Sequence, residues 1–173
     1  MAVARYGTVE QKVRQVVASL GDDVHYMFKN WAQANEEIDR LVGPTVIFVL
    51  PPSGTLDMHY SMVRDYPECQ IAFVTSTDFD FEGAENDNLV EQMKRLCVRF
   101  LVALNHSGLF ELVEGAVPYR VLYDTFDENV TGIAITLTLQ EEEGIIACAN
   151  QYRSTDEEES EEEETEDDES EEG

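Results

Sequence analysis

The segment from Asp78 to Asp87 contains the residue types that come closest to a ligand-binding pattern. Its carboxylates are Asp78, Asp80, Glu82, Glu85 and Asp87. Carboxylates at alternate positions can share a hard cation such as Ca²⁺. The segment nevertheless lacks the full spacing of a calcium-binding loop, and phenylalanines alternate with its first carboxylates, as in an anchored loop or an edge strand. We therefore expect solvated or helix-capping carboxylates. A metal-dependent enzyme built on this segment is a less favoured hypothesis, behind the two that are given at the end of this subsection.

The other residue types that support catalysis are scattered. His25, His59 and His106 stand singly, without a His-x-x-x-His pair, so each is expected to be an ordinary surface or half-buried histidine. Ser53 lies in Pro-Pro-Ser-Gly, which is not the Gly-x-Ser-x-Gly pattern of a nucleophile elbow. We expect no catalytic, cofactor-binding or metal-binding residue, and a protein that is not an enzyme.

The cysteines give no sign of a metal site or a disulfide framework. Cys69, Cys97 and Cys148 lie far apart in apolar surroundings. This spacing favours buried free thiols in a reducing cell.

The chain ends in a strongly acidic tail. Residues 156–172 contain 14 of the 37 acidic residues and none of the 11 basic ones, so they carry −14 of the formal −26 and leave −12 for the rest. A block of like charge without apolar residues cannot offset the entropy lost on ordering. We predict a single folded domain over residues 1–153 and a disordered tail over residues 154–173.

The composition also argues against several classes of protein. General nucleic-acid binding needs clusters of Lys and Arg for the phosphates, and the body is acidic. No stretch of about 18 apolar residues that could span a membrane is present. Residues 1–7 lack the basic and apolar regions of a signal peptide.

The clearest structural pattern is a long amphipathic helix from about Asn86 to Asn105. Its core face consists of apolar residues at helical spacing: Leu89, Met93, Leu96, Cys97, Phe100 and Leu104. Glu91, Arg95 and Arg99, four residues apart, form a polar stripe on the other side. Within 96–104 only Arg99 is polar. We expect this half to be covered on more than one side, either by another part of the chain or by another subunit.

A β-hairpin is predicted to follow the helix. Apolar residues occupy every second position in 119–124 and in 133–139, which is the period of a strand with one apolar face. The segment 127–129 supplies the turn between the two strands. The apolar faces of the helix and the hairpin are expected to bury each other.

Further elements are predicted along the rest of the chain. Thr8 and Gln11 form a capping box that begins a short amphipathic helix, which Gly21 ends. The remaining predictions are a central strand buried on both sides at 45–50, a partly extended linking segment at 56–66, strands at 70–75 and 109–113, and a short apolar segment at 144–149.

The sequence pattern does not decide the secondary structure of two segments. Residues 24–28 fit either a strand or a helical turn, since periodicity does not decide between them. Residues 31–41 fit a helix with Trp31 in the core, or a loop that Asn35 and Asp39 hold through bonds from their side chains to the backbone.

These elements predict an α+β fold. Strands and helices are mixed without regular alternation, and short turns join the last strands, which must therefore pair antiparallel. The predicted architecture is an antiparallel or mixed sheet with one long amphipathic helix packed across it.

Several blocks of the sequence resemble a known group of proteins. They are Trp31-x-x-Ala34-Asn35-x-x-Ile38-Asp39-Arg40, Pro44 with the strand that ends in Leu50-Pro51-Pro52-Ser53-Gly54, the acidic Phe-Asp-Phe-Glu loop, the helix 88–105, and Asp127-x-Asn129-Val130-Thr131-Gly132 before an alternating strand. Together they look like virion proteins of tailed bacteriophages, especially the crAss-like and related Bacteroidetes phages. The resemblance covers roughly residues 8 to 150. The acidic tail has no counterpart in that family.

The resemblance implies a structural function. Proteins of this plan look like ring components of the phage neck or tail, such as connectors, adaptors or tail-terminator-like subunits below the portal, without an enzyme site. The implied partners are copies of the same chain in a homo-oligomeric ring, the portal and other ring or tail proteins, and genomic DNA that passes through the lumen without specific binding. The implied location is the virion, assembled in the host cytoplasm, with no membrane involved.

The residues themselves leave a second function open. An acidic tail can capture a basic protein partner, as histone chaperones and DNA mimics do. For the ring, the candidate contact surfaces are the apolar half of the long helix and the strand near Leu139.

Overall fold

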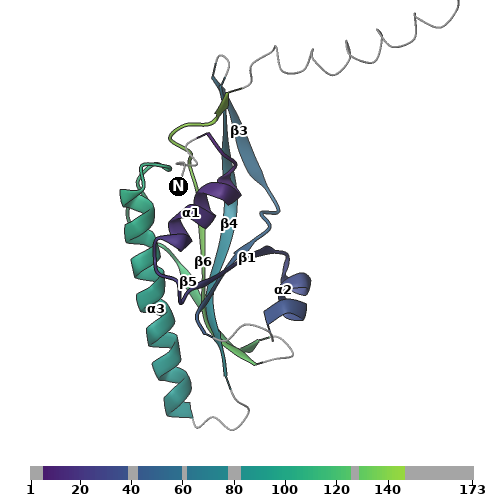
Figure 1. Cartoon of the computed structure of the whole chain (residues 1–173), viewed down its shortest axis with the longest axis vertical. Coiled ribbons are helices and arrows are strands. Elements are labelled where there is room, and N and C mark those ends of the chain that lie inside the picture. Colours follow the sequence, from purple (N-terminus) through teal and green to yellow (C-terminus); the bar gives the residue numbers. More distant parts are fainter. Residues whose placement is uncertain (1–5, 39–42, 60–61, 78–82, 126–128, 147–173) are drawn as a thin grey trace, which may run out of the picture.

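The computed structural model describes residues 6–38, 43–59, 62–77, 83–125 and 129–146 (Figure 1). These residues form the helices α1 (Val9–Ala18), α2 (Trp31–Glu37) and α3 (Gly83–His106). They also form the strands β1 (His25–Lys29), β2 (Thr45–Val49), β3 (Gly54–His59), β4 (Met62–Ser76), β5 (Tyr119–Thr125), β6 (Val130–Thr138) and β7 (Ile145–Ile146). The predicted tail at 154–173 and the acidic loop at 78–82 lie outside the described residues.

The strands form a mixed sheet in the order β1-β2-β4-β6-β5. β1 runs parallel to β2, whereas the β2–β4, β4–β6 and β6–β5 pairs are antiparallel. β3 and β7 lie outside this order and pair with the first part of β4. The predicted α+β class with a mixed sheet is therefore confirmed.

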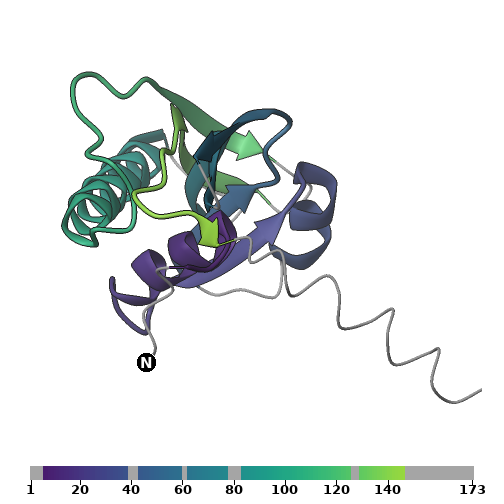
Figure 2. The same ribbon diagram turned by 90° about the horizontal axis from the view of Figure 1, so that it is seen from above.

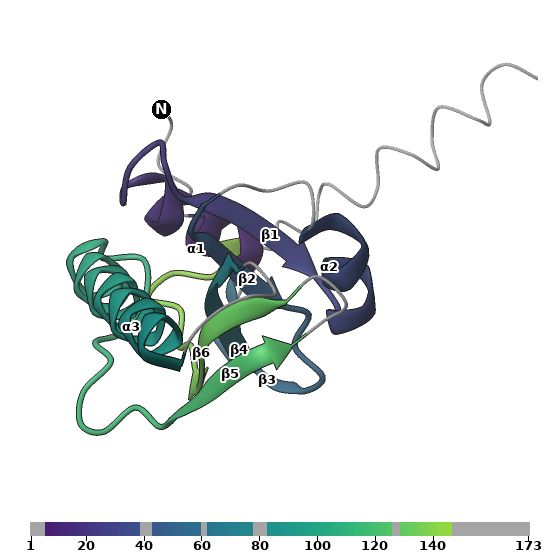
Figure 3. The ribbon, with the colours of Figure 1, turned by 90° about the horizontal axis from the view of Figure 1, so that it is seen from below.

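The middle strands are buried on both faces. All five residues of β2 are buried, which confirms the predicted central strand. On one face Phe48 and Phe73 join the core under α1 and α3, where the rings of Phe73 and Phe100 lie 5.5 Å apart. On the other face Ile47 packs with Ala34 of α2 in a second, smaller cluster. Figures 2 and 3 show α1 and α3 on one side of the sheet and α2 on the other.

Two helices share the larger face of the sheet. α3 contacts β4 and β6, whereas α1 contacts β1, β2 and α3. The prediction of one long helix packed across the sheet is thus corrected, because α1 has an apolar face of its own, with Val9, Val13, Val16 and Val17 buried. The edge strand β5 lies at the margin of the area that the two helices cover.

Capping boxes begin both short helices. The Thr8 hydroxyl accepts from the backbone N–H of Gln11 at 3.3 Å, and the Gln11 side chain accepts from the Thr8 N–H at 3.0 Å, as predicted. Asn30 and Gln33 form the same arrangement at α2. The segment 24–28, which fitted either a strand or a helical turn, lies largely in the strand β1. The segment 31–41 begins as the helix α2, and Trp31 packs against the smaller cluster. Asp39 lies outside the described residues.

Two predictions along the chain are wrong. The segment 56–66 is not a linking segment, because β3 pairs with the first part of β4 in a hairpin, in register from Gly54↔Pro67 to His59↔Met62. The segment 109–113 is not a strand, and it makes only an isolated bridge through Phe110. Phe110 is buried in the core under α3. Over so few residues, an apolar pattern caused by such burial cannot be told from that of a strand.

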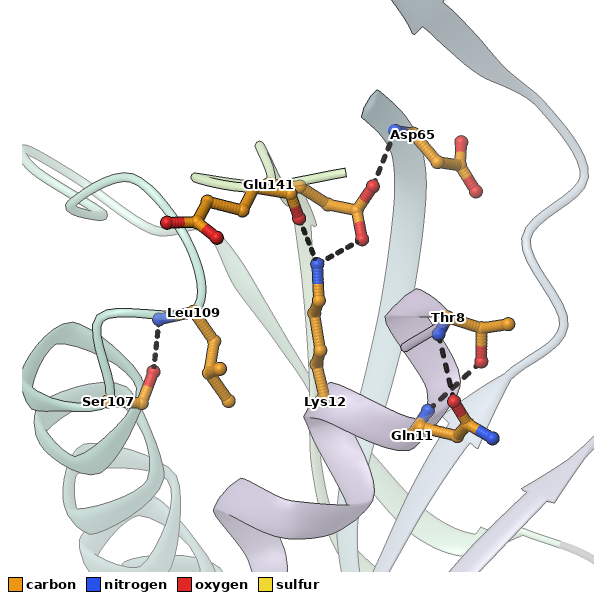
Figure 4. A network of polar contacts seen from close by, with 8 residues as sticks. Thr8, Gln11, Lys12, Asp65, Ser107, Leu109 and Glu141 are labelled. Carbon is orange, nitrogen blue, oxygen red and sulfur yellow. Dashed lines mark hydrogen bonds and ion pairs between the residues drawn. The ribbon is translucent and has the colours of Figure 1, made fainter. Parts of the chain in front are cut away.

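A buried ion pair joins α1 to the chain that follows β6 (Figure 4). Lys12 Nζ lies 2.6 Å from Glu141 Oε1, and the two side chains are 0% and 2% exposed. Lys12 also donates to the Glu143 carbonyl, and Glu141 Oε2 accepts from the backbone N–H of Asp65 on β4 at 2.7 Å. Three distant segments meet at this network. Its polar atoms need one another, since an unpaired charge here would be cut off from water.

The substitution Lys12→Met should destabilise the fold by about 3–5 kcal/mol, because it leaves the Glu141 carboxylate buried without a counter-charge. Urea unfolding followed by circular dichroism measures this loss. The double variant Lys12→Met/Glu141→Gln should recover part of it, since a neutral amide can still accept from the Asp65 N–H.

The exposed pair Arg14–Glu10 is the matched control on the same helix. The Arg14 side chain is 64% exposed, so Arg14→Met should cost less than about 1 kcal/mol. Equal losses for Lys12→Met and Arg14→Met would show that burial does not set the strength of the Lys12 pair.

Candidate assembly surface

The described part of the acidic segment 78–87 is not arranged as a metal site. Asp87 lies on the first turns of α3, and its Oδ1 accepts from the Tyr123 hydroxyl at 3.2 Å. Asp78, Asp80 and Glu82 lie outside the described residues. Among the residues that the structure does describe, no group of three or more His, Cys, Asp or Glu side chains is placed to hold a metal ion.

The histidines and Ser53 remain apart in the fold. His25 begins β1, His59 ends β3 and His106 ends α3. The Ser53 hydroxyl donates to Glu68 Oε2 at 2.7 Å, across the base of the β3–β4 hairpin.

Two cysteines are buried free thiols, as predicted. Cys69 on β4 and Cys97 on α3 are 0% and 5% exposed. Burial raises the pKa of the Cys69 thiol to about 12 and that of the Cys97 thiol to about 11. Cys148 lies outside the described residues.

The outer face of α3 exposes apolar side chains where a surface helix is normally polar. Val98 is 59% exposed and Val102 is 49% exposed, and Arg95 and Arg99 lie beside them on the same face. The core face is nearly as predicted, but Val90 is buried in place of the half-exposed Leu89. The second cover expected for this half of the helix is thus supplied only in part by α1, and the two valines remain in solvent.

A second exposed apolar row lies on β5. Tyr119, Val121 and Tyr123 are 54%, 38% and 50% exposed. The row faces α3, because Lys94 Nζ lies 5.2 Å from the centre of the Tyr119 ring and the Tyr123 hydroxyl donates to Asp87 Oδ1. The intervening Leu122 points to the opposite side, where it is buried in the smaller cluster.

A groove connects these two features. Its volume is about 220 Å³, and its lining is mostly apolar: Lys94, Cys97, Val98, Leu101, Val117, Tyr119, Ile133 and Ile135. We call the exposed side chains around it the α3–β5 surface, defined by Val98, Val102, Tyr119, Val121 and Tyr123. Apolar side chains gathered in this way, on an edge strand, are typical of a protein–protein contact.

A third exposed row lies on the β3–β4 hairpin. Leu56 and Met58 are 65% and 67% exposed. They are two positions apart on β3 and so share one face of the strand. We call this pair the β3 row. The Asp57 carboxylate between them accepts from the Tyr66 hydroxyl at 3.4 Å.

The sequence located only one of these features as a contact surface. The scarcity of polar residues in 96–104 indicated the outer face of α3. The predicted surface near Leu139 is wrong, since Leu139 is 0% exposed and belongs to the main core. The β3 row was missed because Leu56-Asp57-Met58 is too short a pattern to identify a strand. Its period-two alternation was the one available signal.

The two buried thiols should not react with a thiol reagent at pH 8 in the native protein. With pKa values near 12 and 11, a thousandth or less, roughly, of either group is thiolate at that pH. The measurement is absorbance after addition of an aromatic disulfide to a Cys148→Ser variant, with and without denaturant. Both thiols should react in denaturant, and rapid native reaction of Cys97 would contradict the burial described above.

No family model and no curated protein matches this chain. The resemblance to neck and tail proteins of phages therefore remains a prediction from the sequence. None of the helices in the described residues is long and apolar enough to cross a membrane.

Proposed function

We propose that this protein is a non-enzymatic structural subunit that forms a symmetric ring in the neck or tail of a tailed bacteriophage. In that position it would join the portal or an adjacent ring to the tail. The observation that carries the proposal is the α3–β5 surface, where Val98 and Tyr119 are 59% and 54% exposed beside an apolar groove. A lone subunit would leave this surface in water, whereas a neighbouring subunit would bury it.

The sheet provides edges suited to repeated contacts. β1 and β5 are the two ends of the strand order, and each pairs on only one side among the described strands. Unlike edges on opposite sides of one body favour head-to-tail contacts, which close into a ring when the rotation between subunits permits. β2 and most of β6 are buried on both faces. This supports the proposal too, because a closely packed subunit keeps the same shape in every copy of a ring.

The charge of the chain is compatible with a lumen through which DNA passes. The formal net charge is −26, of which the tail contributes −14. Like charges repel, so an acidic wall would not retain the phosphate backbone as a basic wall does. The acidic tail also supports the second candidate function, capture of a basic protein partner.

The purified full-length chain should have the mass of a defined symmetric oligomer, and it should be present in purified phage particles. Native mass spectrometry and mass photometry measure the first expectation, and protein analysis of the particles measures the second. The proposal would be contradicted if the chain is strictly monomeric at high concentration and is also missing from the particles.

Deletion of residues 154–173 separates the two candidate functions. The ring proposal expects the oligomer to persist, because the α3–β5 surface is unchanged. If the shortened chain still assembles but no longer binds a basic protein such as a histone, the tail is a separate binding segment. If assembly is lost instead, the contact does not reside in the α3–β5 surface.

A further inference from the structure

The β3 row is the most exposed pair of large apolar side chains in the described residues. Leu56 and Met58 are 65% and 67% exposed, more than any residue of the α3–β5 surface. Among the described strands β3 pairs with β4 alone, in register from Gly54↔Pro67 to His59↔Met62. It is therefore an edge strand with an apolar row and an open line of backbone groups, which a partner can cover.

The β3 row cannot reach the α3–β5 surface of its own chain. Met58 is opposite Val63 of β4, whereas Val121 is aligned through Ile133 with Phe73 of β4. These two positions of β4 are ten residues apart, roughly 33 Å along a strand. Figure 1 likewise shows β3 toward the upper end of the long axis and β5 toward the lower end.

The β3–β4 hairpin and the second half of α3 carry opposite net charge. The hairpin residues 54–68 contain Asp57, Asp65 and Glu68 but only one basic residue, Arg64. The helix residues 95–106 contain two basic residues, Arg95 and Arg99, and no acidic one, although the chain as a whole is strongly acidic. The Arg99 guanidinium also donates to the Leu20 carbonyl of its own chain. When the hairpin of one copy approaches the second half of α3 of the next, the charges of these two segments therefore attract one another.

We propose that the β3 row of one subunit packs against the α3–β5 surface of a second copy. Leu56 and Met58 lie over Val98 and Tyr119, and the acidic side chains of the hairpin approach Arg95 and Arg99. This contact deepens the ring proposal and rests on it, since it names the segment of the neighbouring subunit that covers the exposed apolar face. The contact is heterologous, because the two surfaces involved are different and lie at separate places on the subunit.

Two double variants test the contact. Val98→Glu/Val102→Glu changes the α3–β5 surface, and Leu56→Glu/Met58→Glu changes the β3 row. The two valines are 59% and 49% exposed, and Glu has a higher helix propensity than Val, so the first variant should fold normally. The matched control is Leu112→Glu, at a residue that is 62% exposed and belongs to neither surface. Thermal unfolding confirms that each variant is folded.

Each double variant alone should be monomeric, with subunit association weakened roughly 100-fold or more through the loss of two apolar contacts. An equimolar mixture should form a 1:1 dimer and nothing larger. In that dimer the intact β3 row of one variant meets the intact α3–β5 surface of the other, and the remaining contact would place Glu against Glu. The Leu112→Glu control should keep the wild-type oligomer. Native mass spectrometry distinguishes all of these species.

The outcomes that overturn the contact differ from those that overturn the ring. If the wild type is oligomeric and either double variant keeps that oligomer, the contact is wrong but the ring proposal stands. If both variants are monomeric but their mixture does not dimerise, each surface pairs with something other than its proposed partner. If the wild type is itself monomeric and missing from phage particles, both proposals fail.

Discussion

The pairing of β4 with β6 is the interaction on which the rest of the structure depends. It runs from Glu68↔Thr138 to Ser76↔Val130 without a break, and most of the side chains along it are buried on one face or the other. Gly132 is required within it, because a Cβ there would lie 2.0 Å from the Phe73 carbonyl oxygen. α3 packs on one face of this pair, and residues of both strands belong to the smaller cluster on the other face.

The positions of the helices over the sheet explain why an apolar surface remains in solvent. α3 lies over β4 and β6, and α1 occupies the rest of the face over β1 and β2. The edge strand β5 extends beyond this cover, so its row of Tyr119, Val121 and Tyr123 stays partly exposed, although Tyr119 and Tyr123 contact Lys94 and Asp87 of α3. The exposed valines of α3 continue the same area. The candidate assembly surface thus results from a sheet that is wider than the helices that cover it.

The length of β4 has a second consequence. Its later part pairs with β2 and β6 in the body, while its first part pairs with β3 and β7. The Lys12–Glu141 pair lies near the change from one part to the other, where Glu141 accepts from the backbone of Asp65. This network joins the base of the hairpin to α1 and to the segment after β6. A hairpin held in this way can present Leu56 and Met58 at a constant position.

The sequence alone determined the elements whose pattern is local. The capping box at Thr8, the doubly apolar strand at 45–50, the helix around Phe100 and the alternation in β6 each follow from side-chain spacing, which short-range geometry fixes. The sequence also indicated that the half of the helix around Val98 has too few polar residues. It could not indicate which element would cover that half, because periodicity describes one element at a time.

Only the tertiary structure decided how these elements share the available surface. It showed that α1 and α3 divide one face of the sheet, that Leu139 is core rather than contact surface, and that Leu56 and Met58 lie on an edge strand. It also brought Lys12 within 2.6 Å of Glu141 across most of the chain. Each of these facts depends on residues far apart in sequence, and burial is a property of the assembled layers rather than of any one segment.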